Sequence, residues 1–164
     1  MRQLLFIASF LFLLTSACKS HKDAAVQTGV FHPDSIFATL ERQPCFGRCP
    51  AFYVTIYNSG KAVYEGHSTV EKLGRWNGTL TKDQMKQITD KAAEFHLDTL
   101  QNEYVNKYLV DFPGHSFSVI LNGSLKRVTV METQLPEIIY TFEKHMEEII
   151  SQVSWTKEEP KKTE

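Results

Sequence analysis

The stretch Ala51-Phe52-Tyr53-Val54-Thr55-Ile56-Tyr57-Asn58-Ser59-Gly60 decides the fold of this chain. Side chains alternate between two faces as in a β-strand, with Val54 and Ile56 on one face and Thr55 on the other. Asn58-Ser59-Gly60 is a turn signal, after which residues 61–66 can return as a second strand. The pattern predicts a β-hairpin over residues 51–66. Because both faces of its first strand carry apolar or aromatic residues, the pattern allows cover on both.

Two more strands are predicted next to this hairpin. Upstream, apolar residues at every second position predict a strand over residues 36–41. Downstream, residues 69–76 are a candidate fourth strand, although Gly74 interrupts the pattern. The first half of the domain is therefore expected to hold three strands and a candidate fourth.

Residues 80–96 begin with a complete helix-start signal. Thr81 can cap the first turn while Gln84 reaches back to it, and Leu80 can pack against Met85. The apolar positions at helical spacing are Met85, Ile88, Ala92 and Phe95. We therefore predict an amphipathic helix that ends near residue 96.

A second hairpin and a last helix complete the pattern, after a polar and aromatic connection over residues 97–114. Residues 115–121 and 125–131 read as strands, and Asn122-Gly123 between them is typical of a type I′ turn. The last helix is expected to start near Pro136. Its buried stripe is expected at Leu135, Ile139, Phe142, Met146, Ile149 and Val153.

These elements predict an α+β fold. An antiparallel sheet is built from two hairpin regions, and two helices pack against it, in the order β-β-β-(β)-α-β-β-α. Residues 35–153 form a single domain in this interpretation, and the Lys/Glu/Pro-rich residues 154–164 form a disordered charged tail.

The N-terminus has the layout of a secretory signal. Arg2 precedes an apolar run from Leu4 to Leu14, which is shorter than the roughly 20 residues of a spanning helix. Small residues then lead to Cys18, an arrangement that resembles the bacterial lipobox. We expect residues 1–17 to be a cleaved signal peptide, Cys18 to carry lipid, and residues 18–34 to form a flexible tether.

This interpretation places the protein in the bacterial cell envelope, anchored to a membrane by its N-terminal lipid. The second residue of the mature chain, Lys19, is not the aspartate that marks inner-membrane retention in enteric bacteria, so the outer membrane is favoured by analogy. The whole chain has 18 basic and 19 acidic residues, and no basic stripe suggests a nucleic-acid partner. Two or more acyl chains would make the anchoring stable.

Cys45 and Cys49 are the remaining cysteines once Cys18 carries lipid. Outside the cytoplasm such a pair is normally oxidised, which favours a structural disulfide. A turn through Gly47 can bring the two Cα atoms within reach. The alternative is a thiol redox or copper-binding site at Cys45-x-x-x-Cys49-Pro50, which resembles the motif of Sco-type copper chaperones. Against that alternative, the motif leads into a strand, whereas reactive thiols favour a helix start.

The segment Pro44-Cys45-Phe46-Gly47-Arg48-Cys49-Pro50-Ala51-Phe52 also resembles a bacterial domain of unknown function with a Cys-Phe-Gly-x-Cys-Pro-x-Tyr signature. Asp111-Phe112-Pro113 resembles the Asp-x-Pro before that family's second hairpin. Phe52 stands where the family usually has tyrosine. The resemblance spans roughly residues 35–153 and implies a fold and an envelope setting, but no activity.

Other chemistry-bearing residues have ordinary explanations. The six histidines form no close metal-binding pair, and Asp111 near His115 is more typical of a turn than of an acid–base pair. The sequence has no nucleophile elbow and no glycine-rich phosphate loop. We therefore expect no catalytic residue, no metal site and no cofactor.

The interpretation that remains is a non-catalytic binding domain with an envelope protein as its partner. Phe46, Arg48, Arg75 and Trp76 lie in or near predicted turns, and arginine and tryptophan often anchor protein interfaces. These four residues are the candidate contact surface. Two alternatives stay open, the thiol site described above and an inhibitor of a secreted enzyme.

Overall fold

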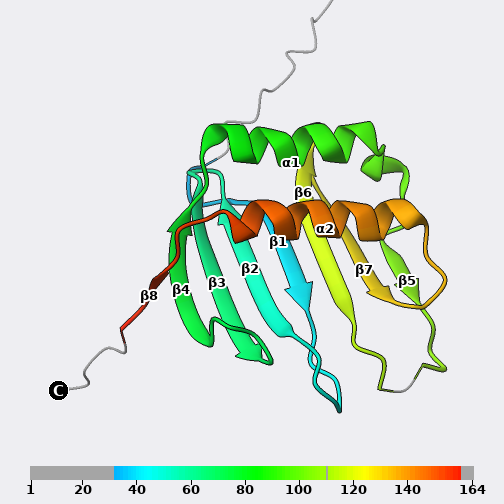
Figure 1. Ribbon diagram of the computed structural model, residues 1–164. Coiled ribbons are helices and arrows are strands. Elements are labelled where there is room, and N and C mark those ends of the chain that lie inside the picture. The colour runs from blue at the N-terminus through cyan, green and yellow to red at the C-terminus, as the bar shows by residue number, and fades with distance from the viewer. Residues whose placement is uncertain (1–31, 110, 160–164) are drawn as a thin grey trace, which may run out of the picture.

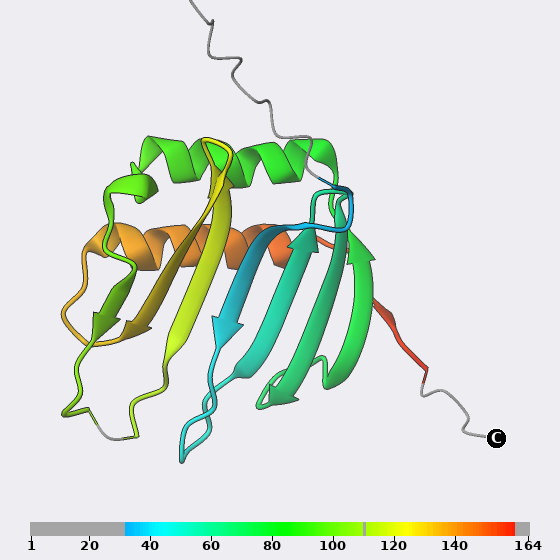
Figure 2. The ribbon, with the colours of Figure 1, turned by 180° about the vertical axis from the view of Figure 1, so that it is seen from behind.

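The computed structural model describes residues 32–109 and 111–159 of the chain. One eight-stranded sheet has the order β5-β7-β6-β1-β2-β3-β4-β8. Helices α1 (Lys82–Glu94) and α2 (Glu137–Ser151) both lie on one face of this sheet, and no helix of the described chain lies on the other (Figure 1, Figure 2). The predicted α+β class and the predicted order of elements are confirmed.

Strand β1 (Ile36–Arg42) lies at the centre, between the two hairpin regions. One side holds β2 (Ala51–Tyr57), β3 (Lys61–Ser68), β4 (Gly74–Thr79) and β8 (Thr156–Lys157). The other side holds β6 (His115–Leu121), β7 (Ser124–Met131) and β5 (Glu103–Val105). All neighbouring strands are antiparallel except β5 and β7, which are parallel.

The structure departs from the sequence prediction in three strands. Strand β5 lies inside the predicted connection 97–114, and β4 begins at Gly74, where a strand interruption was expected. Residues 154–159, which the sequence assigns to a disordered tail, are instead ordered, and Thr156–Lys157 pair with β4 as strand β8. The cause of this order is packing, because Trp155 lies against the core and donates a hydrogen bond from Nε1 to the carbonyl of Ile150.

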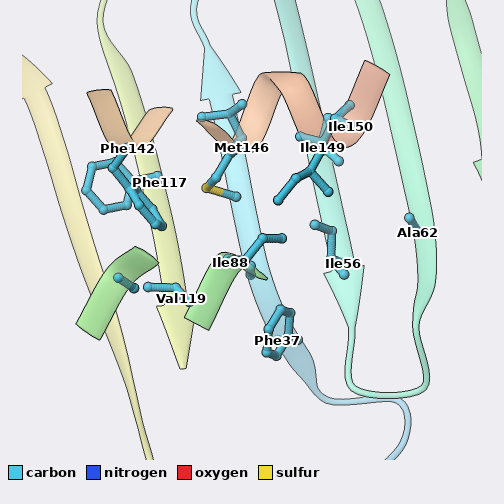
Figure 3. Packing of buried hydrophobic residues seen from close by; sticks show 14 of the residues in the cluster. Phe37, Ile56, Ala62, Ile88, Phe117, Val119, Phe142, Met146, Ile149 and Ile150 are labelled. Carbon is cyan, nitrogen blue, oxygen red and sulfur yellow. The ribbon is translucent and has the colours of Figure 1, made fainter. Parts of the chain in front are cut away.

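The core lies between the helices and the sheet (Figure 3). Alternate residues of the central strands point to the helices, and from α2 Phe142 packs against Phe117 of β6 with ring centroids 5.0 Å apart. Ile88 of α1 is also fully buried. The predicted stripe is confirmed in α2 at Ile139, Phe142, Met146 and Ile149, all buried. Val153 is buried just after the helix ends, and Leu135 is partly buried just before it starts.

The predicted ends of these elements are also confirmed. Thr81 accepts a hydrogen bond from the Gln84 backbone N–H at 3.2 Å, and Gln84 accepts one from the Thr81 N–H at 2.9 Å, which forms the capping box. Asn122 and Gly123 both have positive φ, at 49° and 79°, as a type I′ turn requires. Among the described residues, no helix is long and apolar enough to cross a membrane.

Strand direction sorts the loops to two ends of the sheet. Residues 43–50, 69–73, 106–109 and 111–114 lie at the end where β1 finishes, which we call the loop end (Figure 1). The described chain starts at the opposite end, where the Ser59 N–H donates to the Pro33 carbonyl at 3.0 Å. The N-terminal segment therefore enters the domain at the end farthest from these loops.

Candidate binding surface at the loop end

A disulfide between Cys45 and Cys49 closes the turn that joins β1 to β2, with the two Cα atoms 5.7 Å apart. Inside this small ring, the Gly47 N–H donates to the Sγ of Cys45 at 3.3 Å. The predicted disulfide is therefore present. Pro50 follows the ring and leads directly into β2 at Ala51, so neither sulfur lies at a helix start.

Phe46 and Arg48 project from this ring, which we call the tip loop (residues 44–50). Phe46 is 92% exposed, and Arg48 is exposed as well. A hollow of about 270 Å³ lies between the tip loop and the loop that leads to β6 (residues 106–109 and 111–114), which we call the neighbouring loop. Phe46 and Phe112 are among the residues that line it. In that neighbouring loop Tyr108 is 80% exposed. The loop end therefore presents several aromatic side chains to solvent.

A second hollow lies between α2 and the β3–β4 loop, and we call it the aromatic groove. Its volume is about 430 Å³. Phe52 and Tyr64 stack with ring centroids 5.5 Å apart, and Trp155 meets Tyr64 at 5.7 Å with a tilt of 58°. The groove is lined by Arg42, Pro50, Phe52, Tyr64, Val70, Glu71, Lys72, Glu147, Ile150, Ser151 and Trp155.

Gly66 allows one wall of the aromatic groove to form. A Cβ atom at this position would overlap the backbone carbonyl of Lys72 and crowd Val70. The β3–β4 loop can therefore lie directly over β3 only because residue 66 has no side chain. Val70 of this loop lines one wall of the groove, and Ile150 of α2 lines the other.

An ion-pair network borders the groove on the α2 side. Arg42 donates from Nη1 to Glu143 at 2.8 Å, and from Nε and Nη2 to Oε1 of Glu147 at 3.0 and 2.7 Å. His115 Nδ1 lies 2.6 Å from the second oxygen of Glu143, which is fully buried. Burial by itself would lower the pKa of the Arg42 guanidinium, but the carboxylates of Glu143 and Glu147 outweigh burial and raise this pKa above its ordinary value.

The sequence prediction missed Glu143, although a signal for it was present. The buried positions of α2 include Ile139, Phe142 and Met146, and residue 143 falls on the same stripe. A carboxylate at a buried helix position requires a charged or hydrogen-bonding partner. From the sequence, Asp111 was weighed as an acid–base partner of His115. In the structure, the carboxylate that contacts His115 is that of Glu143.

The four candidate contact residues do not form one surface. Phe46 and Arg48 lie together on the tip loop, whereas Arg75 and Trp76 are neighbours on β4 and point to opposite faces of the sheet. Arg75 forms ion pairs with Glu65 at 2.6 Å and Glu158 at 2.9 Å, on the face without helices.

Trp76 lies on the helix-covered face of β4, where it packs at the edge of the core. It donates from Nε1 to the Leu73 carbonyl at 3.1 Å, and Lys157 lies over its ring. Cys18 lies outside the described residues. Within residues 32–109 and 111–159, no three His, Cys, Asp or Glu side chains are grouped as metal ligands.

The fold and these surfaces define a small α+β domain in which one sheet carries both helices on a single face. The chain belongs to the family described as Domain of unknown function (DUF6438), whose model matches residues 37–150. The matched range contains the disulfide, the ion-pair network and most of the aromatic groove, while Ser151 and Trp155 of the groove lie beyond it. No curated protein matches the sequence.

Proposed function

We propose that this protein is a lipid-anchored domain of the bacterial cell envelope that binds a protein partner through its tip loop. The observation that carries the binding role is Phe46, a large apolar side chain 92% exposed on a ring closed by the Cys45–Cys49 disulfide. Burying such a side chain in a partner releases about 1.5–3 kcal/mol. An exposed phenylalanine on a restrained turn therefore has the chemistry of an interface anchor.

The disulfide favours binding because it limits motion before the partner arrives. Ordering a flexible loop at an interface costs roughly 0.5–1.5 kcal/mol for each immobilised side chain. The ring between Cys45 and Cys49 is already closed, and the ladder of β1 with β2 holds its base through the Arg42–Phe52 pair. A partner would therefore meet a loop that has lost much of this freedom.

The anchoring part of the proposal rests on the N-terminal sequence. The apolar run before Cys18 and the small residues next to this cysteine fit cleavage and lipidation in an exported protein. A disulfide in the domain is consistent with an oxidising compartment. Since the chain enters at the end opposite the tip loop, a membrane anchor at Cys18 leaves Phe46 free to face away from the bilayer. Outer-membrane attachment is favoured by Lys19.

The binding role is tested by photo-crosslinking in cells that make the full-length chain. A photoreactive phenylalanine analogue at position 46 is expected to give a discrete crosslinked product, which mass spectrometry identifies. The matched control places the same analogue at Lys61, an exposed residue at the opposite end of the sheet. If positions 46 and 61 give the same products, the tip loop has no specific partner.

The anchor is tested separately by labelling with a clickable fatty acid. Cys18→Ser is expected to abolish the label and move the protein from the membrane fraction to the soluble fraction. Cys45→Ser is the control and should keep both. Persistent labelling of the Cys18→Ser protein would refute lipidation at this residue without affecting the proposal for the tip loop.

An inhibitor of a secreted enzyme is the second candidate, because the tip loop is convex. A protruding ring with Phe46 and Arg48 at its surface suits a concave cleft, and active sites are usually concave. In this version the crosslinked partner is an exported enzyme, and the purified protein lowers its activity. Loss of inhibition on replacing Phe46 by serine, with the fold intact, supports it.

A further inference from the structure

We propose that the aromatic groove is a second binding site, which takes a lysine- or arginine-bearing segment of a peptide. The site shares only Pro50 with the tip loop, and it does not depend on the role proposed for Phe46. Its walls come from α2 and the β3–β4 loop, and its aromatic side chains come from β2, β3 and the segment before β8.

The aromatic side chains supply both apolar contact and attraction for a cation. Phe52 and Tyr64 stack nearly parallel, at 16°, and Trp155 tilts against Tyr64. The long stem of lysine or arginine packs on apolar surface while its charged head stays near water. A cation over an aromatic face is further attracted by the ring. A volume of about 430 Å³ suits a short peptide segment.

Two carboxylates of the lining are open to a cationic ligand. Glu71 is exposed and forms no ion pair within the described residues. Glu147 also lines the groove, and both hydrogen bonds from Arg42 to it end on Oε1, so Oε2 accepts none from Arg42. Burial and the charge of Glu71 together raise the pKa of the Tyr64 phenol, so this part of the groove disfavours further negative charge.

The lining also contains two cations, Arg42 and Lys72, and they differ in how strongly they repel a positively charged ligand. Arg42 is compensated twice, because it donates to Glu143 as well as to Glu147. Lys72 has no ion pair in the described chain, so it is the uncompensated positive charge in this groove. Removing Lys72 should therefore strengthen binding of a basic peptide, whereas removing Glu71 should weaken it.

The experiment titrates the full-length protein, in detergent, with the peptide acetyl-Ala-Leu-Lys-Leu-Ala-amide. Two matched peptides carry norleucine or glutamate in place of the lysine, and calorimetry measures each affinity. We expect the lysine peptide to bind about fivefold or more tightly than the norleucine peptide, and the glutamate peptide to bind most weakly. Equal affinity of the lysine and norleucine peptides, or no binding at millimolar concentration, overturns the proposal.

Single substitutions test whether the lysine peptide binds in the aromatic groove. Glu71→Gln is expected to weaken the lysine peptide about two- to fivefold, and Lys72→Ala is expected to strengthen it by a similar factor. Glu65→Gln is the control, since Glu65 lies on the opposite face of β3 and pairs with Arg75. An unchanged affinity in Glu71→Gln refutes the groove as the site. Phe46→Ser should leave this titration unchanged, so failure of the tip-loop proposal remains distinguishable.

Discussion

The two faces of the sheet are filled by different chemistry. The helix-covered face is packed with apolar side chains such as Phe117 and Leu40. Within the described part of the chain, the fully buried carboxylate on this face is Glu143, which Arg42 and His115 contact. The face without helices carries hydroxyl groups at its centre instead. The comparison indicates that most of the apolar burial that stabilises this domain lies on the helix-covered face. The loop end lies outside that core, so its side chains can contact a partner without loss of core packing.

Removing an aromatic ring from the covered face should have the largest effect. Phe117→Ala takes away a fully buried ring that packs on Phe142. We expect the free energy of unfolding to fall by about 3–5 kcal/mol, because the transfer free energy is lost and a cavity remains. Urea denaturation followed by circular dichroism measures it. Leu125→Ala, at a half-exposed position of β7, is the control and should change stability by no more than about 0.5 kcal/mol.

Breaking the buried ion-pair network is expected to cost slightly less. Glu143→Ala leaves Arg42 with Glu147 alone and leaves His115 without its carboxylate partner, so we expect a loss of about 3 kcal/mol in denaturant unfolding. Glu147→Ala is the matched control, one helical turn along. Because the Glu147 side chain is 41% exposed, its loss should cost only about 1 kcal/mol or less. Equal losses in the two variants would mean that burial of Glu143 does not matter.

Opening the disulfide should cost an intermediate amount. The loop between Cys45 and Cys49 is short, so closing it restricts the unfolded chain by only about 2 kcal/mol. The double variant Cys45→Ser/Cys49→Ser is expected to lose that much stability and to remain folded.

The redox alternative is tested by the reduction potential of the same pair. A structural disulfide is expected below about −300 mV, measured by equilibration with thiol buffers. A potential in the range of redox-active proteins, well above that value, would favour the thiol alternative and would contradict a purely structural role.

The hydroxyl groups on the face without helices should contribute still less to the free energy of unfolding. Thr39 Oγ1 and Ser118 Oγ lie 2.7 Å apart, and both residues are 0% exposed. Thr39→Val leaves the Ser118 hydroxyl without this partner, for a loss of about 1–2 kcal/mol in thermal or urea unfolding. Adding Ser118→Ala should restore most of that loss, because the pair is then removed together. Additive losses would show that the two hydroxyl groups are not coupled.

Local patterns predicted most of this fold. Alternation, the Thr81 capping box and the Asn122-Gly123 turn are short-range features, so the strands, the helices and their order follow from the sequence. Strand β5 could not be predicted, because three residues show no period and its order depends on pairing with β7. Strand β8 depends in the same way on Trp155 packing against the core.

The candidate sites also differ in whether they depend on local sequence or on tertiary contacts. The Cys45–Cys49 bond and the exposure of Phe46 are properties of one short loop, which the sequence displays directly. The aromatic groove and the Arg42–Glu143 pair join residues about a hundred positions apart. Only tertiary contacts bring such residues together, and a single sequence does not state them.

The smallest effect on stability should come with the clearest effect on binding. Phe46→Ser changes an exposed residue that contributes nothing to the core, so its free energy of unfolding should stay within about 0.5 kcal/mol of the parent. If the tip loop is an interface anchor, the same change should remove the partner found by crosslinking, which affinity capture with the full-length protein measures. Tyr108→Ser, at a comparably exposed site on the neighbouring loop, should weaken capture less, because the disulfide does not hold that loop. A Phe46→Ser protein that captures the partner normally would move the binding site away from the tip loop.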